Sequence, residues 1–453
     1  MKQPTYFISI ISLCLLSACS TFDDLAFDDK ASSQLQALAK TNVEQANQTA
    51  AIPLTDLLAI AEVDNLITTA LANNPGLQQT WLTLKTAEQQ FNVSSAAQWP
   101  DISAQLNATK AEANTANYNP GLNVAWTLDI WQQLANATSA REAELAASGY
   151  AYQGARDLLA ANVMQSYLAL VQYAQLIDIE KRKVSTLKTN ESVIVDRYRK
   201  GLIDLKDLDT AKSSTQSSQA TLVDYQEQYQ QALRNLTLLT GVTGTGVTKN
   251  RLIYRNEFPE VIMPLDKIPS QNLARRPDLQ QAYQGIIGEQ YQHKVAYKAL
   301  LPSLSLSASL SSNNSNLHDA LFGSNAWQLL GQLTAPVFNA GKLKSEVEIA
   351  RLSAEKSYWA FQDTLLSAVN EVDNAIAQEQ AISKRLTLTE SALQSAKRSE
   401  VTYTERYRQG TVSLLDLLQV QQQTFSLQAQ VTQLTYQKLN NRITLGLALG
   451  LGV

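Results

Sequence analysis

The residue types that most often carry catalysis are few in this sequence and poorly placed for it. The chain of 453 residues has two histidines, His293 and His318, and two cysteines. The histidines lack metal-ligand spacing to any partner, and they do not assemble with a serine and an aspartate into a nucleophilic triad. Residues 241–246, Gly-Val-Thr-Gly-Thr-Gly, are not followed by Gly-Lys-Ser/Thr, so we interpret them as a turn at a helix end. The sequence therefore argues against an enzyme and predicts no catalytic cofactor and no resident metal.

The cysteine with an informative position is Cys19, near the N-terminus. Lys2 and the apolar run 6–16 have the order of a secretory signal, and the run is too short to cross a bilayer as a helix. It ends in Leu-Ser-Ala-Cys at 16–19, which resembles the lipobox of bacterial lipoproteins. That resemblance implies removal of a signal peptide over 1–18 and a lipidated linker over 19–54, with S-diacylglycerol and an N-acyl chain on Cys19. An ordinary secretory signal with a chance cysteine is the alternative.

Composition and charge narrow the class of protein further. The net charge is -4 and no dense basic stripe occurs, so nothing indicates nucleic-acid binding. Charged residues make up only 17%, and the chain has 11 prolines and 17 glycines. This mixture is typical of long helices with large uncharged polar surfaces.

An internal duplication organises the chain. Residues 74–79, Asn-Pro-Gly-Leu-Gln-Gln, match 276–281, Arg-Pro-Asp-Leu-Gln-Gln, and Arg-Tyr-Arg-Lys-Gly at 197–201 matches Arg-Tyr-Arg-Gln-Gly at 406–410. A spacing this long indicates a duplicated half-molecule rather than a solenoid repeat. We expect a first repeat over 55–241, a linker or equatorial segment over 242–270, and a second repeat over 271–450.

Each repeat contains two runs in which apolar and polar residues alternate, as in half-buried strands. The runs cover about 101–110 and 121–129 in the first repeat, and about 302–311 and 326–336 in the second. About nine to eleven residues is the length that a tilted strand needs to cross a membrane, although a soluble sheet gives the same alternation. Because about eight strands are needed to enclose a lumen, four strands require further copies of the chain.

Two long helical hairpins are predicted, over about 134–240 and about 341–449. Proline is absent from 134–200 and from 341–409, and a continuous helix of about 67 residues would be roughly 100 Å long. Gly201 and Gly410 fit helix ends, and Asp207 and Asp416 fit the first turns of the helices that follow. A coiled-coil seam is indicated by apolar residues that recur every seven positions: Val347, Ala354, Phe361, Ala368, Ala375 and Ile382.

Together with the lipobox and the duplicated turns, Trp-Thr-Leu-Asp-Ile-Trp at 126–131 and Pro-Val-Phe-Asn-Ala-Gly at 336–341 complete a recognisable pattern. Over about 55–450 the sequence resembles the TolC-like outer-membrane efflux proteins, in particular their lipoprotein branch (OprM/CusC/NodT-like). The resemblance implies an α+β membrane protein, a homotrimer whose twelve-stranded outer-membrane β-barrel continues into a periplasmic α-helical coiled-coil barrel. It implies a passive efflux channel, partnered by a periplasmic adaptor and an inner-membrane pump of the RND type.

The same resemblance assigns roles at the periplasmic tip. Asp207 and Tyr407 match a pair that is linked in the closed TolC gate, whereas Lys206 and Val412 occupy the positions of its companion pair. Asp416 matches a carboxylate of the acidic aperture ring, and three such side chains would raise one another's pKa and attract cations. Simple helix N-terminal charge is the alternative for Asp207 and Asp416. The implied adaptor-contacting turns, in which the usual valine is replaced, are Lys200-Gly201-Leu202 and Gln409-Gly410-Thr411.

Two other functions are compatible with parts of this pattern. The same architecture serves as the outer-membrane duct of type I protein secretion. A non-transporting, periplasm-spanning structural lipoprotein would have the helices without barrel strands, and the four alternating runs, with Trp126 and Trp327 as interfacial residues, count against it.

Overall fold

The computed structural model describes residues 25–43, 53–57, 61–112, 116–242, 257–259 and 273–453. The chain divides into two compact units. A strand unit contains residues up to 34 together with 90–144 and 282–361, and a helical unit contains 35–89, 145–281 and 362–453. Cys19, the signal peptide over 1–18 and most of the predicted linker over 242–270 lie outside the described residues.

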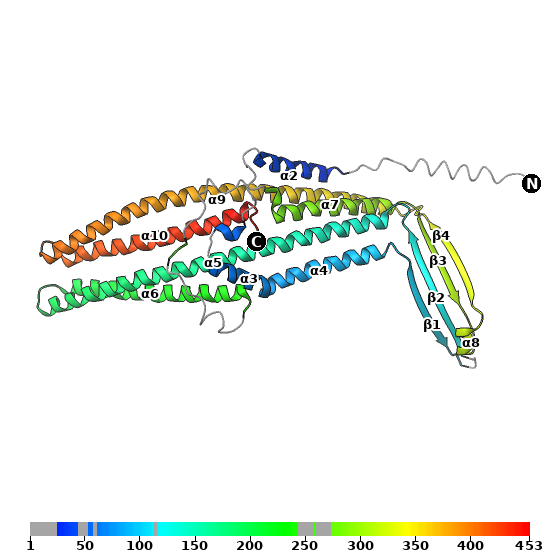
Figure 1. Ribbon diagram of the computed structural model, residues 1–453, viewed down its shortest axis with the longest axis horizontal. Coiled ribbons are helices and arrows are strands. Elements are labelled where there is room, and N and C mark those ends of the chain that lie inside the picture. Colours follow the sequence, from blue (N-terminus) through cyan, green and yellow to red (C-terminus); the bar gives the residue numbers. More distant parts are fainter. Residues whose placement is uncertain (1–24, 44–52, 58–60, 113–115, 243–256, 260–272) are drawn as a thin grey trace, which may run out of the picture. The chain divides into compact units, whose positions relative to one another are not determined.

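The strand unit is built on one antiparallel sheet with the order β1-β2-β3-β4 (Figure 1). Its strands are β1 (Asp101–Thr109), β2 (Asn117–Leu128), β3 (Ser303–Ser311) and β4 (Ala326–Thr334). The central pair, β2 and β3, joins the two halves of the duplicated chain, so both repeats contribute to a single sheet. Within the described residues, β1 and β4 each have one strand neighbour and form the two edges.

The register of the sheet gathers most of the apolar residues on one face. Ile102 lies opposite Val124, Val124 opposite Ala308, and Ala308 opposite Leu329. The next row, Ser103-Asn123-Ser309-Gln328, lies on the other face because successive side chains point to opposite sides of a strand. The alternation predicted from the sequence is therefore confirmed, and it runs in step across all four strands.

The structure differs from the predicted strand region in two ways. β2 begins at Asn117 rather than near 121, because its first residues continue to pair with β1 as far as Thr109. Those residues, Asn-Tyr-Asn-Pro, lack apolar alternation, and Pro120 is unusual inside a strand, so the sequence pattern did not reveal them. Between β3 and β4 lies a short helix, α8 (Leu317–Phe322), that was not predicted.

The two long helices are α5 (Gln133–Arg199) and α9 (Lys342–Arg408), each of 67 residues. α6 (Leu205–Thr240) and α10 (Leu414–Ala448) follow them and complete the two predicted hairpins. In the predicted seam of α9, Ala354, Phe361, Ala368, Ala375 and Ile382 are all buried. None of the helices in the described part of the chain combines the length and the apolar character needed to cross a membrane.

Shorter helices precede the strands in each repeat. They are α3 (Ala61–Asn73) and α4 (Pro75–Ala96) in the first repeat, and α7 (Pro277–Lys298) in the second. A further helix, α2 (Phe27–Val43), occupies part of the stretch that was predicted only as a linker. The start of this helix is held in the strand unit by stacking of Phe27 on Tyr358 at 5.5 Å and by a hydrogen bond from Gln290 Nε2 to Asp28 Oδ1 at 3.1 Å.

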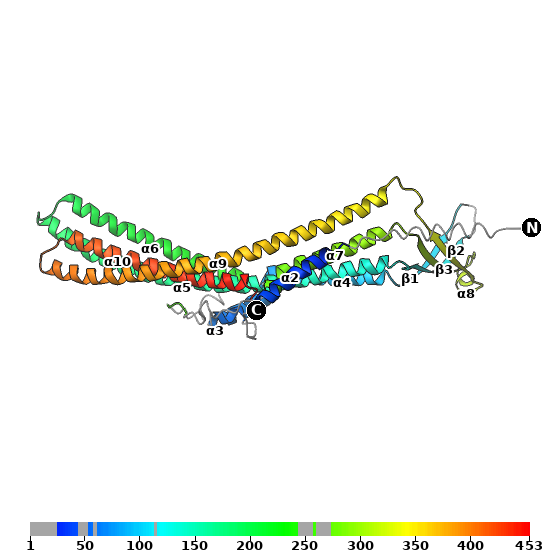
Figure 2. The same cartoon turned by 90° about the horizontal axis from the view of Figure 1, so that it is seen from above.

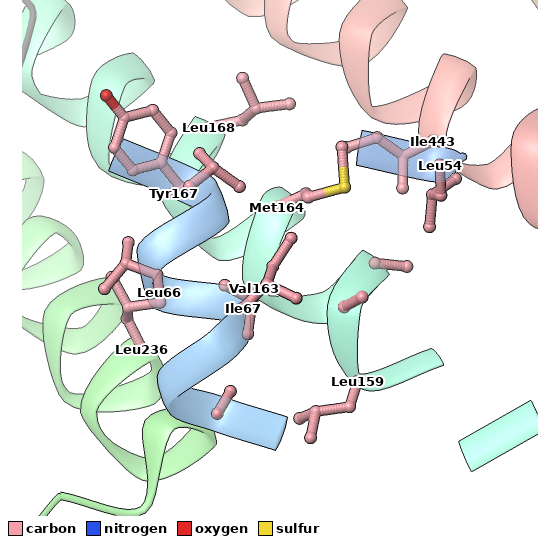
Figure 3. Packing of buried hydrophobic residues seen from close by; sticks show 14 of the residues in the cluster. Leu54, Leu66, Ile67, Leu159, Val163, Met164, Tyr167, Leu168, Leu236 and Ile443 are labelled. Atoms are coloured by element: carbon pink, nitrogen blue, oxygen red, sulfur yellow. The ribbon is translucent and has the colours of Figure 1, made fainter. Parts of the chain in front are cut away.

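The core of the helical unit lies where α3, α5, α6 and α10 meet (Figure 3). α3 presents Val63, Leu66, Ile67 and Ala70 on one face, at the spacing of an amphipathic helix. Leu66 and Ile67 lie near Val163 and Tyr167 of α5, and Leu236 of α6 closes the cluster. Burial of each large apolar side chain contributes roughly 1.5–3 kcal/mol, so this cluster fixes the short helices on the long one.

Candidate functional site

The two glycine turns that join the long helices share one backbone structure. Gly201 and Gly410 have φ angles of 69° and 73°, in the left-handed region that favours glycine. Gly201 N donates to Tyr198 O at 2.9 Å, and Leu202 N donates to Arg197 O at 3.0 Å. In the second repeat, Gly410 N donates to Tyr407 O at 3.0 Å and Thr411 N to Arg406 O at 2.9 Å. Both helices thus end in a Schellman motif, and the prediction that the glycines end them is confirmed.

The predicted adaptor-contacting residues are all exposed. Lys200, Gly201 and Leu202 form the first turn, and Gln409, Gly410 and Thr411 form the second. Leu202 is 68% exposed, which is high for a large apolar side chain. The exposed side chain of Leu202 can be reached by another protein, and the adaptor contact of these six residues stays a prediction.

Asp207 lies in the first turn of α6, as predicted, but Asp204 caps that helix. The Asp204 side chain accepts a hydrogen bond from the backbone N–H of Asp207 at 3.1 Å. Asp207 itself is half-buried, and both its gate role and its role as helix N-terminal charge stay predictions. A carboxylate three residues before another acidic residue is a capping signal that the sequence did contain.

Asp416 belongs to a capping box at the start of α10. Ser413 Oγ accepts from Asp416 N at 3.1 Å, while Asp416 Oδ2 accepts from Ser413 N at 3.1 Å and from Ser413 Oγ at 2.6 Å. These hydrogen bonds hold the pKa of Asp416 below its usual range. A single chain therefore shows the helix N-terminal role, which was the alternative to the acidic ring. The ring and its raised pKa require several copies and stay a prediction.

The ends of all four long helices pack around one apolar cluster, which we call the tip cluster. Figure 2 shows the turns of both hairpins at the same end of the helical unit. Tyr403 and Tyr407 of α9 are partly buried against it. Its buried members are Leu187 and Ile194 of α5, Leu208 and Ala211 of α6, and Leu414, Leu417 and Leu418 of α10.

The ring of Tyr407 is contacted by a residue that the sequence pattern did not single out. The guanidinium of Arg197, in the last turn of α5, lies 5.5 Å from the centre of the Tyr407 ring. Within the described part of the chain, Asp207 and Tyr407 share no hydrogen bond, so the link implied for that pair stays a prediction. Likewise, no three histidine, cysteine, aspartate or glutamate side chains among the described residues lie close enough together to hold a metal ion.

Comparison with known sequences places these features in context. The family model described as "Outer membrane efflux protein" matches residues 66–242 and 268–451. The protein named "Probable outer membrane lipoprotein SilC", from Salmonella typhimurium, is 27% identical over 399 residues, which are 86% of this chain and 86% of SilC. The cation efflux system protein CusC of Escherichia coli K12 is 26% identical over 400 residues, 86% of this chain and 87% of CusC.

Solved structures share the fold. The crystal structure of CusC matches with a TM-score of 0.79 and 24% identity, over 90% of this chain and 95% of that one. The CmeC outer membrane channel of Campylobacter jejuni matches with a TM-score of 0.82 and 21% identity, over 90% of both chains. The predicted combination of a strand unit with long helical hairpins is therefore that of known outer-membrane channels.

Proposed function

Because the chain belongs to the outer membrane efflux protein family and is thus an outer-membrane channel of an efflux system, we propose that it works as a homotrimer gated at its glycine turns. The proposal depends above all on one observation: the helix ends beside both Schellman turns pack around the tip cluster. A type I secretion duct, which the sequence left open, is less favoured because the matching family and relatives are efflux proteins.

The edges of the sheet support assembly with further copies. β1 and β4 each offer one unpaired edge among the described residues, and open edges favour pairing with another chain. Three copies would give twelve strands, enough to close a barrel around a wet lumen. The apolar face supports a lipid environment on the outside, since Ile102, Trp327, Leu329 and Leu333 are 67%, 79%, 65% and 69% exposed.

Partners at the other end would be a periplasmic adaptor and an inner-membrane pump of the RND type. We expect the adaptor to contact the two exposed glycine turns. A photo-reactive amino acid at Leu202 tests this contact when the channel is expressed together with its adaptor. Cross-linking to the adaptor is expected at Leu202 and not at the equally exposed Val223, in the middle of α6. Equal yields at both positions would contradict the assignment.

The channel itself is proposed to conduct without choosing its cargo. The names of relatives with similar identity state different cargoes: cations for CusC at 26%, pyoverdine for OpmQ at 24% and solvents for SrpC at 24%. A conduit shared by such different systems is expected to leave both energy and selection to the pump. Replacing the pump by a related pump should then change which compounds are exported. Replacing this chain by a related channel should not.

Lipidation of Cys19 is the remaining part of the proposal. Three acyl chains would anchor the protein firmly, whereas one chain binds a membrane only marginally. Mass spectrometry of the mature N-terminus should find Cys19 as the first residue, carrying S-diacylglycerol and an N-acyl chain. An unmodified Cys19 would rule this out.

The gate is tested by electrical recording from purified protein in planar bilayers. If the tip is closed at rest, replacing Tyr407 by Ala should raise single-channel conductance several-fold, and replacing Asp207 by Asn should do the same if the Asp207 carboxylate holds Tyr407. If Asp416 forms a ring in the trimer, Asp416→Asn should reduce the preference for cations over anions. Conductance and selectivity that do not change in any of these variants would refute the proposed gate.

A further inference from the structure

We propose that the stacking of Arg197 on Tyr407 is the contact that keeps the gate closed, and that it links the gate directly to both glycine turns. The inference rests on the proposed function, because it names the element that a gate at the tip would use. It differs from the link implied by family resemblance, in which Asp207 would bind Tyr407.

Arg197 is the arginine of the first turn that is available for this contact. Its neighbour Arg199 lies 3.8 Å from Asp196, and Arg408, the equivalent of Arg199 in the second repeat, lies 3.7 Å from Glu405. Arg197, by contrast, directs its guanidinium at the Tyr407 ring at 5.5 Å. A planar guanidinium stacks on an aromatic face better than a lysine ammonium does, and it keeps its charge at every physiological pH.

The contact joins the two halves of the duplicated chain in an asymmetric way. Arg197 comes from the first Arg-Tyr-Arg turn and Tyr407 from the second. Their counterparts, Arg406 and Tyr198, are exposed, and no ring contact between those two occurs in the described part of the chain. Arg406, which holds the position of Arg197 in the second Arg-Tyr-Arg motif, is therefore a matched control within the same chain.

Both residues of the contact also close the exposed turns through their backbones. Arg197 O accepts the hydrogen bond from Leu202 N at 3.0 Å, and Tyr407 O accepts the one from Gly410 N at 3.0 Å. A partner that moves either turn would pull on one of these carbonyl groups and shift the side chain on the same residue. Since Leu202 is exposed, a bound protein could reach this point and separate the guanidinium from the ring.

The burial of Tyr407 explains why such a separation would open the tip. Its ring packs against the tip cluster, to which α5, α6 and α10 contribute the buried side chains. Without Arg197 over it, the Tyr407 ring could move away from the tip cluster together with α9. Loss of the contact would let the α9–α10 turn move away from the α5–α6 turn.

Removing the hydroxyl group of Tyr407 distinguishes a stacking contact with Arg197 from a hydrogen bond with Asp207. A link from Asp207 needs the phenolic O–H, whereas stacking needs only the ring. Tyr407→Phe should therefore conduct like the wild type if Arg197 is the lock, while Tyr407→Ala and Arg197→Ala should both raise single-channel conductance several-fold. Arg197→Gln, which keeps a long helix-forming side chain without the charge, should behave like Arg197→Ala, and the matched control Arg406→Ala should stay at the wild-type level.

The recordings use full-length, lipidated protein whose oligomeric state is first checked by size-exclusion chromatography. The Arg197→Ala/Tyr407→Ala double variant should conduct no more than either single variant, because both remove the same contact. If Tyr407→Phe opens the channel as far as Tyr407→Ala, or if Arg197→Ala and Arg197→Gln stay at the wild-type level, the inference is wrong. Should Asp207→Asn and Tyr407→Ala still open the channel in that case, the gate itself would stand.

Coupling to the turn has its own test. Leu202→Pro removes the N–H that donates to Arg197 O, whereas Leu202→Ala keeps it. Leu202→Pro should raise conductance to the level of Arg197→Ala, and it should add nothing in a channel that already carries Arg197→Ala. If Leu202→Pro and Leu202→Ala conduct alike, the turn is not coupled to the gate.

Discussion

Arg442 of α10 and Glu379 of α9 form an ion pair that is almost completely buried. Arg442 Nη2 lies 2.7 Å from Glu379 Oε1, and the two side chains are 9% and 3% exposed. Asn441 adds a hydrogen bond from its Nδ2 to Ala375 O at 2.9 Å. Two charges in an apolar helix interface tolerate little sliding, because any shift would leave one of them unpaired. The pair therefore fixes the register of α10 against α9.

Breaking this pair from one side should be strongly destabilising. Glu379→Ala leaves Arg442 buried without a partner, and loss of one member of a buried pair costs about 3–5 kcal/mol. Glu379→Leu combined with Arg442→Met should be less destabilising than Glu379→Ala, because no uncompensated charge is left. Thermal unfolding followed by circular dichroism in detergent measures both. Glu227→Ala, which removes an exposed pair with Arg234, is the control and should leave the melting temperature almost unchanged.

Two glycines with the same backbone conformation should respond very differently to alanine. Gly201 and Gly241 have φ angles of 69° and 66°, but a Cβ at Gly201 would meet nothing within 4 Å. A Cβ at Gly241 would lie 2.2 Å from Asn73 O, where α6 ends against α3. Gly201→Ala should cost about 1 kcal/mol, the strain of a left-handed residue, and Gly241→Ala considerably more. Equal melting temperatures for the two variants would show that the close approach to Asn73 relaxes freely.

The sequence predicts those parts of the fold that repeat with a fixed period. Alternation over 303–311 identifies β3 because every second side chain faces the apolar side, and the spacing of seven finds the buried face of α9. The helix ends at Gly201 and Gly410 can also be predicted from the sequence, because few residues other than glycine adopt the left-handed conformation found there. What is local and periodic can be inferred without coordinates.

Contacts between residues that lie far apart in the sequence leave no periodic pattern from which they could be predicted. Arg197 and Tyr407 meet across two helices, and nothing in their shared Arg-Tyr-Arg motif says which arginine finds which ring. In the sequence Glu379 is one of several charged residues of α9, and its buried ion pair with Arg442 becomes evident only once α10 is placed beside α9. Family resemblance singles out Tyr407 but gives no sign of its contact with Arg197, and the implied link to Asp207 stays a prediction.

Asp157 should make the folded state less stable as the pH rises. Burial raises the pKa of this α5 carboxyl above its usual range, although Val453 N at 3.0 Å and Gln153 Nε2 at 2.9 Å donate to it. The folded chain then holds the proton more tightly than the unfolded chain. Stability falls as the pH rises from about 3.9, the usual aspartate pKa, through the higher pKa of the folded state, and is constant above it.

Asp157→Asn removes this dependence while keeping an oxygen that can accept both hydrogen bonds. The melting temperature of the variant relative to the wild type should therefore increase between pH 4 and pH 7. Glu348→Gln provides a control of opposite sign, because hydrogen bonds from Arg351 lower the pKa of Glu348. The advantage of the wild type over that variant should be present at neutral pH and disappear as the pH falls through the folded pKa of Glu348. If the difference in melting temperature between Asp157→Asn and the wild type does not vary with pH, the raised pKa of Asp157 is contradicted.

Neighbouring residues on β4 should distinguish the two faces of the sheet. Leu329 belongs to the apolar row with Ile102, Val124 and Ala308, and Gln328 belongs to the polar row with Ser103, Asn123 and Ser309. If the apolar face meets lipid, Leu329→Lys should cost about 2–4 kcal/mol near the bilayer midplane, whereas Gln328→Lys would face water in the lumen. The yield of assembled channel in the outer-membrane fraction should accordingly drop for Leu329→Lys and stay near the wild-type level for Gln328→Lys. The opposite order would mean that the lumen lies on the apolar side, and equal yields would mean that this row of the sheet lies outside the hydrocarbon layer.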